Sequence, residues 1–434
     1  MSTEGLSTEG LSSVEPTGFD DVDVFARFDA GAGAREKVDL YNTFRRLRER
    51  APLVESTLTT ELGVDPSIWV TPAHTGYEGL NAPTFLAVGY DAVHTVLRDQ
   101  ENFGQLAQVR AYRHTIGDVL TALESDAHRS ERSLVSQAFS RRAIENWGDE
   151  VIAPVAAGLV AEIGAGDTAE LMSQFAFPFS ARVIAGVLGL PTSQSDRMLN
   201  LALACVALAE PELAEWGKTG MTRWADEVIA ARRADPSNDG HDVISMLVRA
   251  EQDGESLTGE QITTFVRFLY PAGFETTYRA MSNTIVALLS TGQWDVLRAD
   301  RSLLGNAVAE GLRWQTSLIG HPRVARSDVE VDGVHVPEGA VVLAFHAAAN
   351  RDPSRWEDPD RFDITRPIKL NATFGFGAHL CLGKPLAEAE IKRALDVLLD
   401  AFPDLHLDPD ADPADRVVNG VAFRSPAGVQ VRLR

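Results

Sequence analysis

The 434-residue sequence contains only two cysteines, Cys205 and Cys381. Two cysteines exclude a disulfide framework, a four-cysteine zinc site and a four-cysteine iron–sulfur cluster within this chain. Basic residues are also scarce, because 40 lysines and arginines stand against 62 aspartates and glutamates, a net charge of −22. This acidity argues against a nucleic-acid-binding protein, which usually carries a basic face.

The sequence also lacks long apolar runs and a basic, apolar N-terminal start. The longest uncharged run, 280–294, includes Ser, Asn, Gln and Gly, whereas a membrane-spanning helix needs about 20 mainly apolar residues. The N-terminus repeats Ser-Thr-Glu-Gly-Leu, which does not match a secretory signal. We therefore expect a cytoplasmic protein with no membrane partner. It would have a flexible acidic tail over 1–20, which is poor in apolar residues, and one domain over 21–434.

Most of the chain shows the apolar spacing of helices. Between Val324 and Phe345, β-branched residues alternate around Asp332-Gly333 and Glu338-Gly339, which predicts hairpins. Other predicted elements are a strand over 84–88, a loop-rich stretch over 350–383, a helix over 386–402 and two short strands over 417–433. The sequence thus predicts a mainly α fold with a minor β region.

A glycine-rich segment surrounds the second cysteine. The pattern Phe-x-x-Gly-x-x-x-Cys-x-Gly has Phe374, Gly377, Cys381 and Gly383 at its fixed positions. Glycines let a backbone wrap closely around a bulky group, and the helix predicted to follow would favour a thiolate, the form that ligates iron. A buried structural thiol is the alternative for a lone cysteine. A dinucleotide fingerprint is a weaker one, because its third glycine and its βαβ unit are missing.

A second unusual segment lies inside a long predicted helix. The helix would begin at a capping box formed by Thr258 and Gln261 and end near Gly292. Its centre contains Pro271, which removes a backbone hydrogen bond and predicts a local opening. Residues that disfavour the secondary structure around them, as this proline does in a helix, are expected at functional sites.

The residues after that proline suit a binding surface. The small side chains of Ala272 and Gly273 would let a flat ligand lie against the helix, and Glu275 with Thr276 could relay protons. A kinked core helix with a solvated glutamate is the alternative interpretation.

With these two segments in this order, the sequence resembles the cytochrome P450 superfamily of haem–thiolate monooxygenases, from about Ala82 onward. The resemblance implies a triangular, single-domain, mainly α haem enzyme that binds haem b (iron protoporphyrin IX). It implies that Cys381 is the metal ligand, that Thr276 hydrogen-bonds the bound oxygen and that Glu275 helps to deliver protons. The cofactor-binding residues that it implies are His128, Arg132, Ala272, Gly273, Arg323, Phe374, Gly377, His379, Cys381 and Gly383.

Four of these residues would bind the haem propionates. His128 and Arg132 form a His-x-x-x-Arg motif, Arg323 precedes the predicted hairpins, and His379 lies two residues before Cys381. Partly buried carboxylates need charge-assisted hydrogen bonds of this kind. Taken singly, each is more often an ordinary surface group.

The pair Glu310 and Arg313 meets on one helix face, since residues three apart are neighbours there. The resemblance implies that the pair is a buried structural lock, closed by a second arginine. Arg366 is the predicted closing residue and Arg361 the alternative. An exposed pair of this kind would contribute little stability.

The implied reaction inserts one oxygen atom of O2 into a small, mostly hydrophobic substrate. Only 53 residues follow Cys381, so we expect no fused reductase and assign electron supply to a separate ferredoxin and ferredoxin reductase. A peroxide-driven haem peroxygenase and a non-catalytic haem-binding protein remain open alternatives. Glu275 and Thr276 favour the monooxygenase, because O2 activation requires protons.

Two surfaces follow from the same resemblance. The predicted substrate pocket includes segments 103–113 and 198–216 and the side chains of Phe268, Leu269, Ala272, Leu318, Ile319 and Phe423. A basic docking surface for an acidic ferredoxin would include Arg129, Arg132, Arg141, Arg142, Lys384, Lys392 and Arg393. An ordinary solvated face is the alternative for these cations.

Overall fold

The computed structural model describes residues 19, 22–65, 82–113, 116–164, 166–190, 195–207, 210–235, 240–252 and 254–434. The predicted acidic tail over 1–20, apart from Phe19, lies outside these residues. None of the helices in the described ranges combines the length and the apolar character needed to cross a bilayer.

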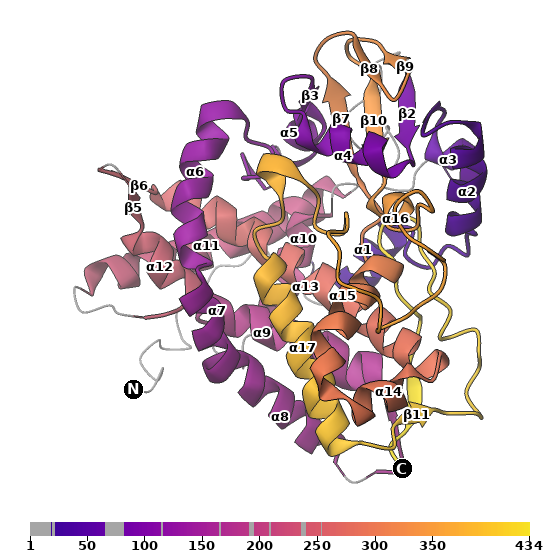
Figure 1. Cartoon of the computed structure of the whole chain (residues 1–434). Coiled ribbons are helices and arrows are strands. Elements are labelled where there is room, and N and C mark those ends of the chain that lie inside the picture. The colour runs from indigo at the N-terminus through magenta and orange to yellow at the C-terminus, as the bar shows by residue number, and fades with distance from the viewer. Residues whose placement is uncertain are drawn as a thin grey trace.

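Helices dominate the structure, as the apolar spacing predicts (Figure 1). The α-helices are α1 Val24–Gly31, α2 Leu40–Arg50, α3 Leu58–Leu62, α4 Tyr90–Arg98, α5 Leu106–Tyr112, α6 Ser125–Ala138, α7 Arg141–Trp147, α8 Ala153–Ile163, α9 Phe177–Leu188, α10 Ser195–Cys205, α11 Pro211–Ala234, α12 Val243–Arg249, α13 Gly259–Ser290, α14 Gln293–Ala299, α15 Leu304–Trp314, α16 His346–Ala349 and α17 Lys384–Ala401. The π-helical turns are η3 Gly148–Ile152 and η4 Met172–Ala176, and the 3₁₀ turns are η6 Arg301–Leu303 and η7 Gly377–His379.

The strands are short and mostly C-terminal. They are β1 Leu53–Glu55, β2 Thr84–Ala87, β3 Phe103–Gly104, β4 Thr168–Glu170, β5 Glu251–Gln252, β6 Glu255–Ser256, β7 His321–Ala325, β8 Val329–Val331, β9 Val334–Val336, β10 Val341–Ala344, β11 His406–Leu407 and β12 Gln430–Arg432. One sheet has the order β1-β2-β10-β7-β3 and another β11-β12-β4, while β5–β6 and β8–β9 form separate pairs.

The hairpin predicted at Asp332-Gly333 is confirmed as β8–β9. Asp332 has φ 48° and Gly333 has φ 76°, as a two-residue turn of the I′ kind requires. The turn at Glu338-Gly339 leads into β10, which pairs with β7 rather than with β9. The prediction of two strands over 417–433 is wrong in part, because the structure has one strand there, β12, and two isolated bridges, Asn419 with Ser425 and Phe423 with Leu318.

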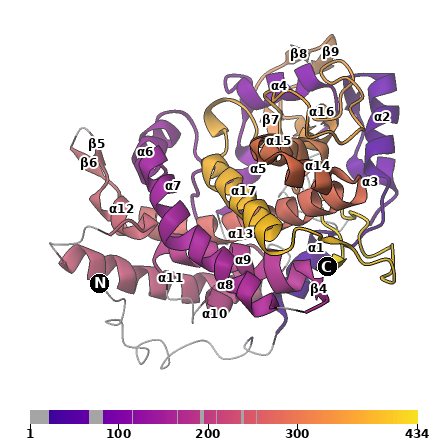
Figure 2. The ribbon, with the colours of Figure 1, turned by 60° about the horizontal axis from the view of Figure 1, so that its bottom comes forward.

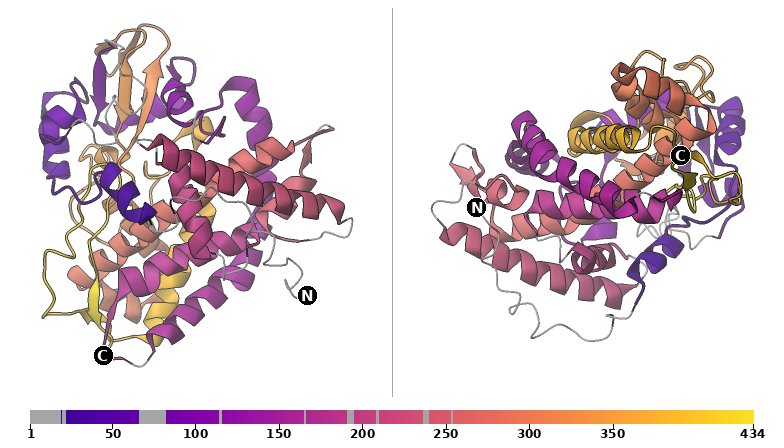
Figure 3. Two further views of the ribbon diagram at one scale, coloured as in Figure 1. Left: turned by 180° about the vertical axis from the view of Figure 1, so that it is seen from behind. Right: turned by 90° about the horizontal axis from the view of Figure 1, so that it is seen from below.

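The sheet and the helices occupy different ends of the molecule. In Figure 1 the strands β2, β7 and β10 stand above the helical body, and α17 passes in front of α13. Turned forward, the same body shows α10 and α11 on one side of α13 and α17 on the other (Figure 2). From behind, α11 crosses the helical body as its outer layer (Figure 3). Helix α13 is therefore the central element.

Helix α13 has the predicted length and start. Thr258 and Gln261 form both hydrogen bonds of the capping box, and the helix runs for 32 residues. It is continuous across Pro271, so the predicted local opening is wrong. Packing against α9, α11, α15 and α17 encloses α13 and outweighs the poor helix propensity of its centre.

The five-stranded sheet separates two small apolar cores. Phe85 and Ala87 of β2 face a core with α4, whereas Leu86 faces a core with α2 that includes Ile319. This split follows from the alternation of side chains along a strand. A larger core fills the space among the helices around α13.

Candidate active site

The Cys381 loop is held by its own backbone. The N–H of Cys381 donates to the carbonyl of Phe374 at 2.9 Å, and the N–H of Leu380 donates to that of Gly377 at 3.1 Å. Gly375 and Gly377 both have φ 73°, a conformation that costs glycine little. The loop thus presents Cys381 just before α17, whose first turn contains a proline, as the sequence predicts.

The sulfur of Cys381 has mixed surroundings. The residue is exposed, and α6 borders its loop, because Arg132 donates from Nη2 to the carbonyl of Leu380 at 2.6 Å. The protein atoms around the sulfur raise the pKa of the Cys381 thiol, whereas the N–H groups of Gly383 and Lys384 and the charge of Arg132 lower it. An added cation at the sulfur would join these groups in favouring thiolate.

A cluster of basic side chains lies beside this loop. The rings of His128 and His379 are 4.1 Å apart between centroids. Burial lowers the pKa of His128 to about 4 and that of His379 to about 3. Burial also lowers the pKa of Arg323 to about 10. Arg132, Arg323 and His321 each depress the pKa of His379, so the cluster combines three separate elements.

The cluster suits a dianionic group. The one carboxylate that raises the pKa of Arg323 is Glu124. In the described part of the chain, the buried Nε2 of His128 has no hydrogen-bond partner. The cations Arg132 and Arg323, together with an unpaired buried histidine nitrogen, fit the two propionates of haem b.

Sequence reasoning missed two residues of this region, His321 and His346. Nδ1 of His321 lies 3.4 Å from Nε2 of His346. The available signal was the spacing of His321 and Arg323, because residues two apart on β7 share one face.

A partly exposed stripe runs along the otherwise buried centre of α13. It consists of Phe268, Leu269, Ala272, Gly273 and Thr276, which recur at intervals of four residues. This spacing places them along one helix face. A Cβ added at Gly273 would lie 2.9 Å from Cδ1 of Ile184, so this glycine also permits close packing against α9.

Glu275 and Thr276 point to different partners. The Thr276 hydroxyl donates to the carbonyl of Ala272 at 2.9 Å. The buried Glu275 carboxylate accepts from Arg279, which also pairs with Asp29 of α1. Arg279 and Asp29 were absent from the predicted site.

The predicted lock residues lie together. Nε and Nη2 of Arg313 donate to the two carboxylate oxygens of Glu310 at 2.7 Å each. Nε of Arg366 lies 3.5 Å from Oε1 of Glu310. Arg361 instead pairs with Asp363 at 3.0 Å and is largely exposed. Arg366 therefore occupies the position predicted for the closing arginine.

The predicted pocket residues divide between two places. Phe268 meets Tyr112 with ring centroids 5.6 Å apart, and Leu318 forms a bridge with Phe423. Ile319 is fully buried in the core beneath α2 instead. We therefore correct its assignment, because adjacent residues of an extended chain face opposite sides. Residues 208–209 of the predicted segment 198–216 lie outside the described residues.

Comparisons with known proteins agree with this architecture. The family model described as Cytochrome P450 matches residues 296–431. The chain is 30% identical over 395 residues to 6-deoxyerythronolide B hydroxylase of Saccharopolyspora erythraea, covering 86% of this chain and 91% of that one. It is 35% identical over 352 residues to cytochrome P450 monooxygenase PikC of Streptomyces venezuelae, covering 78% and 82%.

A solved structure extends the likeness to the fold. The ligand-free P450 monooxygenase TamI superposes with a TM-score of 0.78 at 29% identity and covers 92% of each chain. The fold and the cysteine loop thus define a haem-dependent oxidising enzyme. The chain belongs to the cytochrome P450 family, whose members bind haem through a cysteine thiolate.

Proposed function

We propose that this cytochrome P450 inserts one oxygen atom of O2 into a small, mostly hydrophobic molecule and releases the other as water. The reaction consumes two electrons and two protons per O2. The observation that carries the proposal is Cys381, presented on a glycine-shaped loop beside the basic cluster of His128, Arg323 and His379.

The chain's own residues suit haem binding. Cys381 would ligate the iron, while His128, Arg132, Arg323 and His379 would bind the propionates. The small residues Ala272 and Gly273 would let the flat haem lie against α13. Phe374, Gly377 and Gly383 would shape the Cys381 loop. When bound, haem supplies the activation of O2, a chemistry that belongs to the cofactor.

Glu275 and Thr276 would relay protons. Burial raises the pKa of Glu275 to about 7, so this carboxyl can both hold and release a proton near neutrality. Thr276 lies on the partly exposed stripe of α13, where its hydroxyl can hydrogen-bond a reacting group. These two side chains favour a monooxygenase over a peroxide-driven enzyme, because peroxide use needs no proton delivery.

The substrate class is argued from the apolar side chains near this stripe. Phe268, Leu269, Leu318 and Phe423 contribute apolar surface, which suits a hydrophobic ligand oriented by few polar groups.

A separate ferredoxin with its reductase is the proposed electron source. Of the predicted docking cations, Arg129, Arg141, Lys384 and Arg393 pair with neighbouring carboxylates on their own helices. Arg142 of α7 and Lys392 of α17 have no carboxylate partner among the described residues, and these two helices contact each other. Exposed cations without a carboxylate partner can steer an acidic partner protein.

The deciding experiment is the spectrum of the reduced, carbon-monoxide-bound protein. We expect the red-shifted Soret band of thiolate ligation in the wild type and in Cys205→Ala, since burial raises the pKa of the Cys205 thiol to about 12 and leaves it inert. The band should vanish in Cys381→Ala. A wild-type band in Cys381→Ala would overturn the assignment.

Turnover separates the remaining alternatives. Product formed with reductant and O2 supports a monooxygenase, whereas product formed only with peroxide identifies a peroxygenase. A normal carbon monoxide band without turnover under either condition, across a broad ligand panel, would leave a non-catalytic haem-binding protein.

A further inference from the structure

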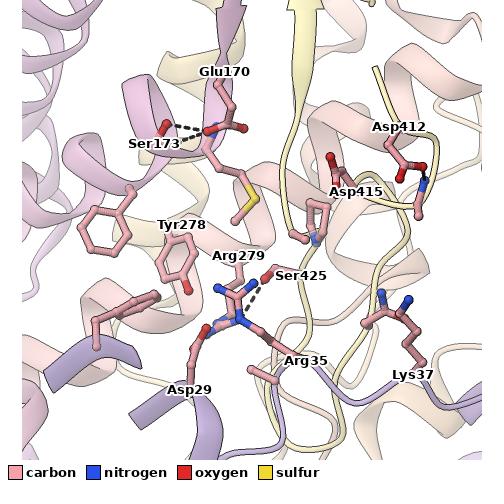
Figure 4. Close-up of a pocket in the computed structure, with 18 residues that line it drawn as sticks. Asp29, Arg35, Lys37, Glu170, Ser173, Tyr278, Arg279, Asp412, Asp415 and Ser425 are labelled. Carbon is pink, nitrogen blue, oxygen red and sulfur yellow. Dashed lines mark hydrogen bonds and ion pairs between the residues drawn. The ribbon is translucent and has the colours of Figure 1, made fainter. Parts of the chain in front are cut away.

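A cavity of about 700 Å³ is lined in part by Tyr278 and Arg279 of α13 (Figure 4). Helix α1, the chain around β4, one turn of α13 and the C-terminal segment 412–427 form its walls. Its lining includes three cations and four carboxylates, which are Asp29, Glu170, Asp412 and Asp415. The acidic excess makes it a favourable place for water and for positive charge rather than for an anion.

Arg279 forms the inner wall of this cavity. Its guanidinium is 1% exposed and makes three different contacts. Nη1 donates to Oγ of Ser425 at 2.8 Å, Nη2 pairs with Asp29, and Nε donates to Glu275. Figure 4 shows Arg279, Asp29 and Ser425 grouped at the base of the cavity. One guanidinium thus joins the cavity wall to the buried carboxyl of Glu275.

Glu275 lies directly behind this wall. It is 2% exposed, and its Oε2 has no hydrogen-bond partner among the described residues. The charged groups that act on it are Arg279 of its own helix and Asp29 of α1, and the Tyr278 phenol lies beside them. Burial raises the pKa of Glu275, Arg279 lowers it and Asp29 raises it again.

The charge balance of this group changes with one proton. With both carboxylates ionised, Asp29, Arg279 and Glu275 carry one uncompensated negative charge in a buried site, which is costly. A proton on Glu275 leaves a neutral acid and a neutral Asp29–Arg279 pair. Asp29 therefore favours the protonated form of Glu275 by competing for the one available cation.

We propose that this cavity is the entrance through which solvent protons reach Glu275, and that the Asp29–Arg279 pair is its gate. A proton passes from cavity water to the Glu275 carboxylate, which then loosens its contact with Arg279, while Arg279 stays with Asp29. The inference rests on the proposed role of Glu275 in proton delivery. Asp29 and Arg279 are positioning residues in it.

Two variants should move the titration of Glu275 in opposite directions. Asp29→Asn removes the competing carboxylate and should lower the pKa of Glu275 by about one unit, whereas Arg279→Gln removes the cation and should raise it by about one to three units. The readout is the pH titration of a buried carboxylic-acid C=O band in the infrared spectrum, assigned by its loss in Glu275→Gln.

The matched control is Glu260→Gln. Glu260 also pairs with a buried arginine of α13, Arg267, at 2.8 Å, but it does not line the cavity. It should leave the titration unchanged. If Asp29→Asn and Arg279→Gln lower the thermal midpoint but do not move the band's titration, the pair is only a structural tie and the gate is refuted.

The entrance is tested by filling the cavity. Ala427 lines it and is exposed, so Ala427→Trp should slow deuterium exchange of the Glu275 band by about tenfold, because exchange would then need local opening. Ala161→Trp, at an exposed position of α8, is the size-matched control. Unchanged exchange in Ala427→Trp would refute the entrance. This readout needs no turnover, so its failure is distinct from a failure of the monooxygenase proposal.

Discussion

Two buried ion clusters in this protein share one local motif and have opposite charge balance. Glu310–Arg313 and Glu275–Arg279 are both acid–base pairs one helical turn apart. The Glu310 carboxylate has two arginine neighbours, Arg313 and Arg366. Arg366 approaches Oε1, the oxygen that also accepts from the N–H of Asp363. Around Arg279, two carboxylates share one guanidinium.

The difference shows how the surroundings of a pair decide its role. Both carboxylate oxygens of Glu310 accept hydrogen bonds, and Arg313 also donates to the carbonyls of Asn350, Pro359 and Arg361. Such a cluster resists change of its charge state. Glu275 keeps one unpartnered oxygen and a pKa of about 7, so it can change its protonation near neutral pH.

The largest expected effect comes from breaking the Glu310 cluster. Arg313→Met leaves the buried Glu310 carboxylate without its main partner, and we expect a loss of about 3–5 kcal/mol in the free energy of unfolding. Urea unfolding and the haem content of the purified protein measure it. A stability within about 1 kcal/mol of wild type, with full haem content, would show that the cluster is no lock.

The second effect comes from removing the titratable acid. Glu275→Gln should fold and bind haem, but turnover should fall by roughly 10²–10⁴-fold, the range of a positioned proton transfer. Steady-state product formation with saturating electron donor measures it. Wild-type turnover would exclude Glu275 from proton delivery.

The same substitution should change how stability depends on pH. A carboxyl with a folded-state pKa of about 7 and an unfolded value of about 4.3 binds more protons when folded between these limits, so it lowers stability as pH rises from about 4.3 to 7. Glu275→Gln should flatten that slope. Urea midpoints at several pH values test this, with Glu260→Gln as the control that keeps the wild-type slope.

Thr276 tests the role of an uncharged side chain next to Glu275. We expect Thr276→Ala to keep consuming reductant while product falls and peroxide rises, since the hydroxyl positions a proton without holding the haem. The ratio of product to reductant measures this. A wild-type ratio would assign the relay to another group.

The smallest effect is expected where ions face water. Arg142→Glu with Lys392→Glu should lower the rate of the first electron transfer several-fold at low salt and flatten its salt dependence, because screening weakens such surface charges. Stopped-flow reduction by a ferredoxin measures the rate, and substrate affinity is the control. Unchanged reduction at low salt would place the docking surface elsewhere.

Sequence reasoning succeeded where the determinants are local. The capping box at Thr258, the turn at Asp332-Gly333 and the loop before α17 each depend on a few adjacent residues, so their geometry could be predicted. The Glu310–Arg313 pair is of the same kind, since residues three apart meet on a helix face.

The missed residues have partners that are distant in sequence. Arg279 follows Glu275 by four residues and was detectable as a helix-face pair, but Asp29 lies 250 residues from Arg279. The opening predicted at Pro271 failed for a related reason. Local propensity cannot report the helices that enclose a segment after folding.

The contact between Asp29 and Arg279 also has a consequence for biosynthesis. Asp29 is made early, its partner Arg279 is 250 positions later in the chain, and Ser425, the other partner of Arg279, follows 146 positions after that. At about 5–20 residues per second, a ribosome needs roughly 12–50 seconds to reach Arg279 after Asp29. The Asp29–Arg279 ion pair can therefore form only late in synthesis, whereas α10, which α1 also contacts, is made earlier. The hydrogen bond from Arg279 to Ser425 can form only after a further 146 residues have been made.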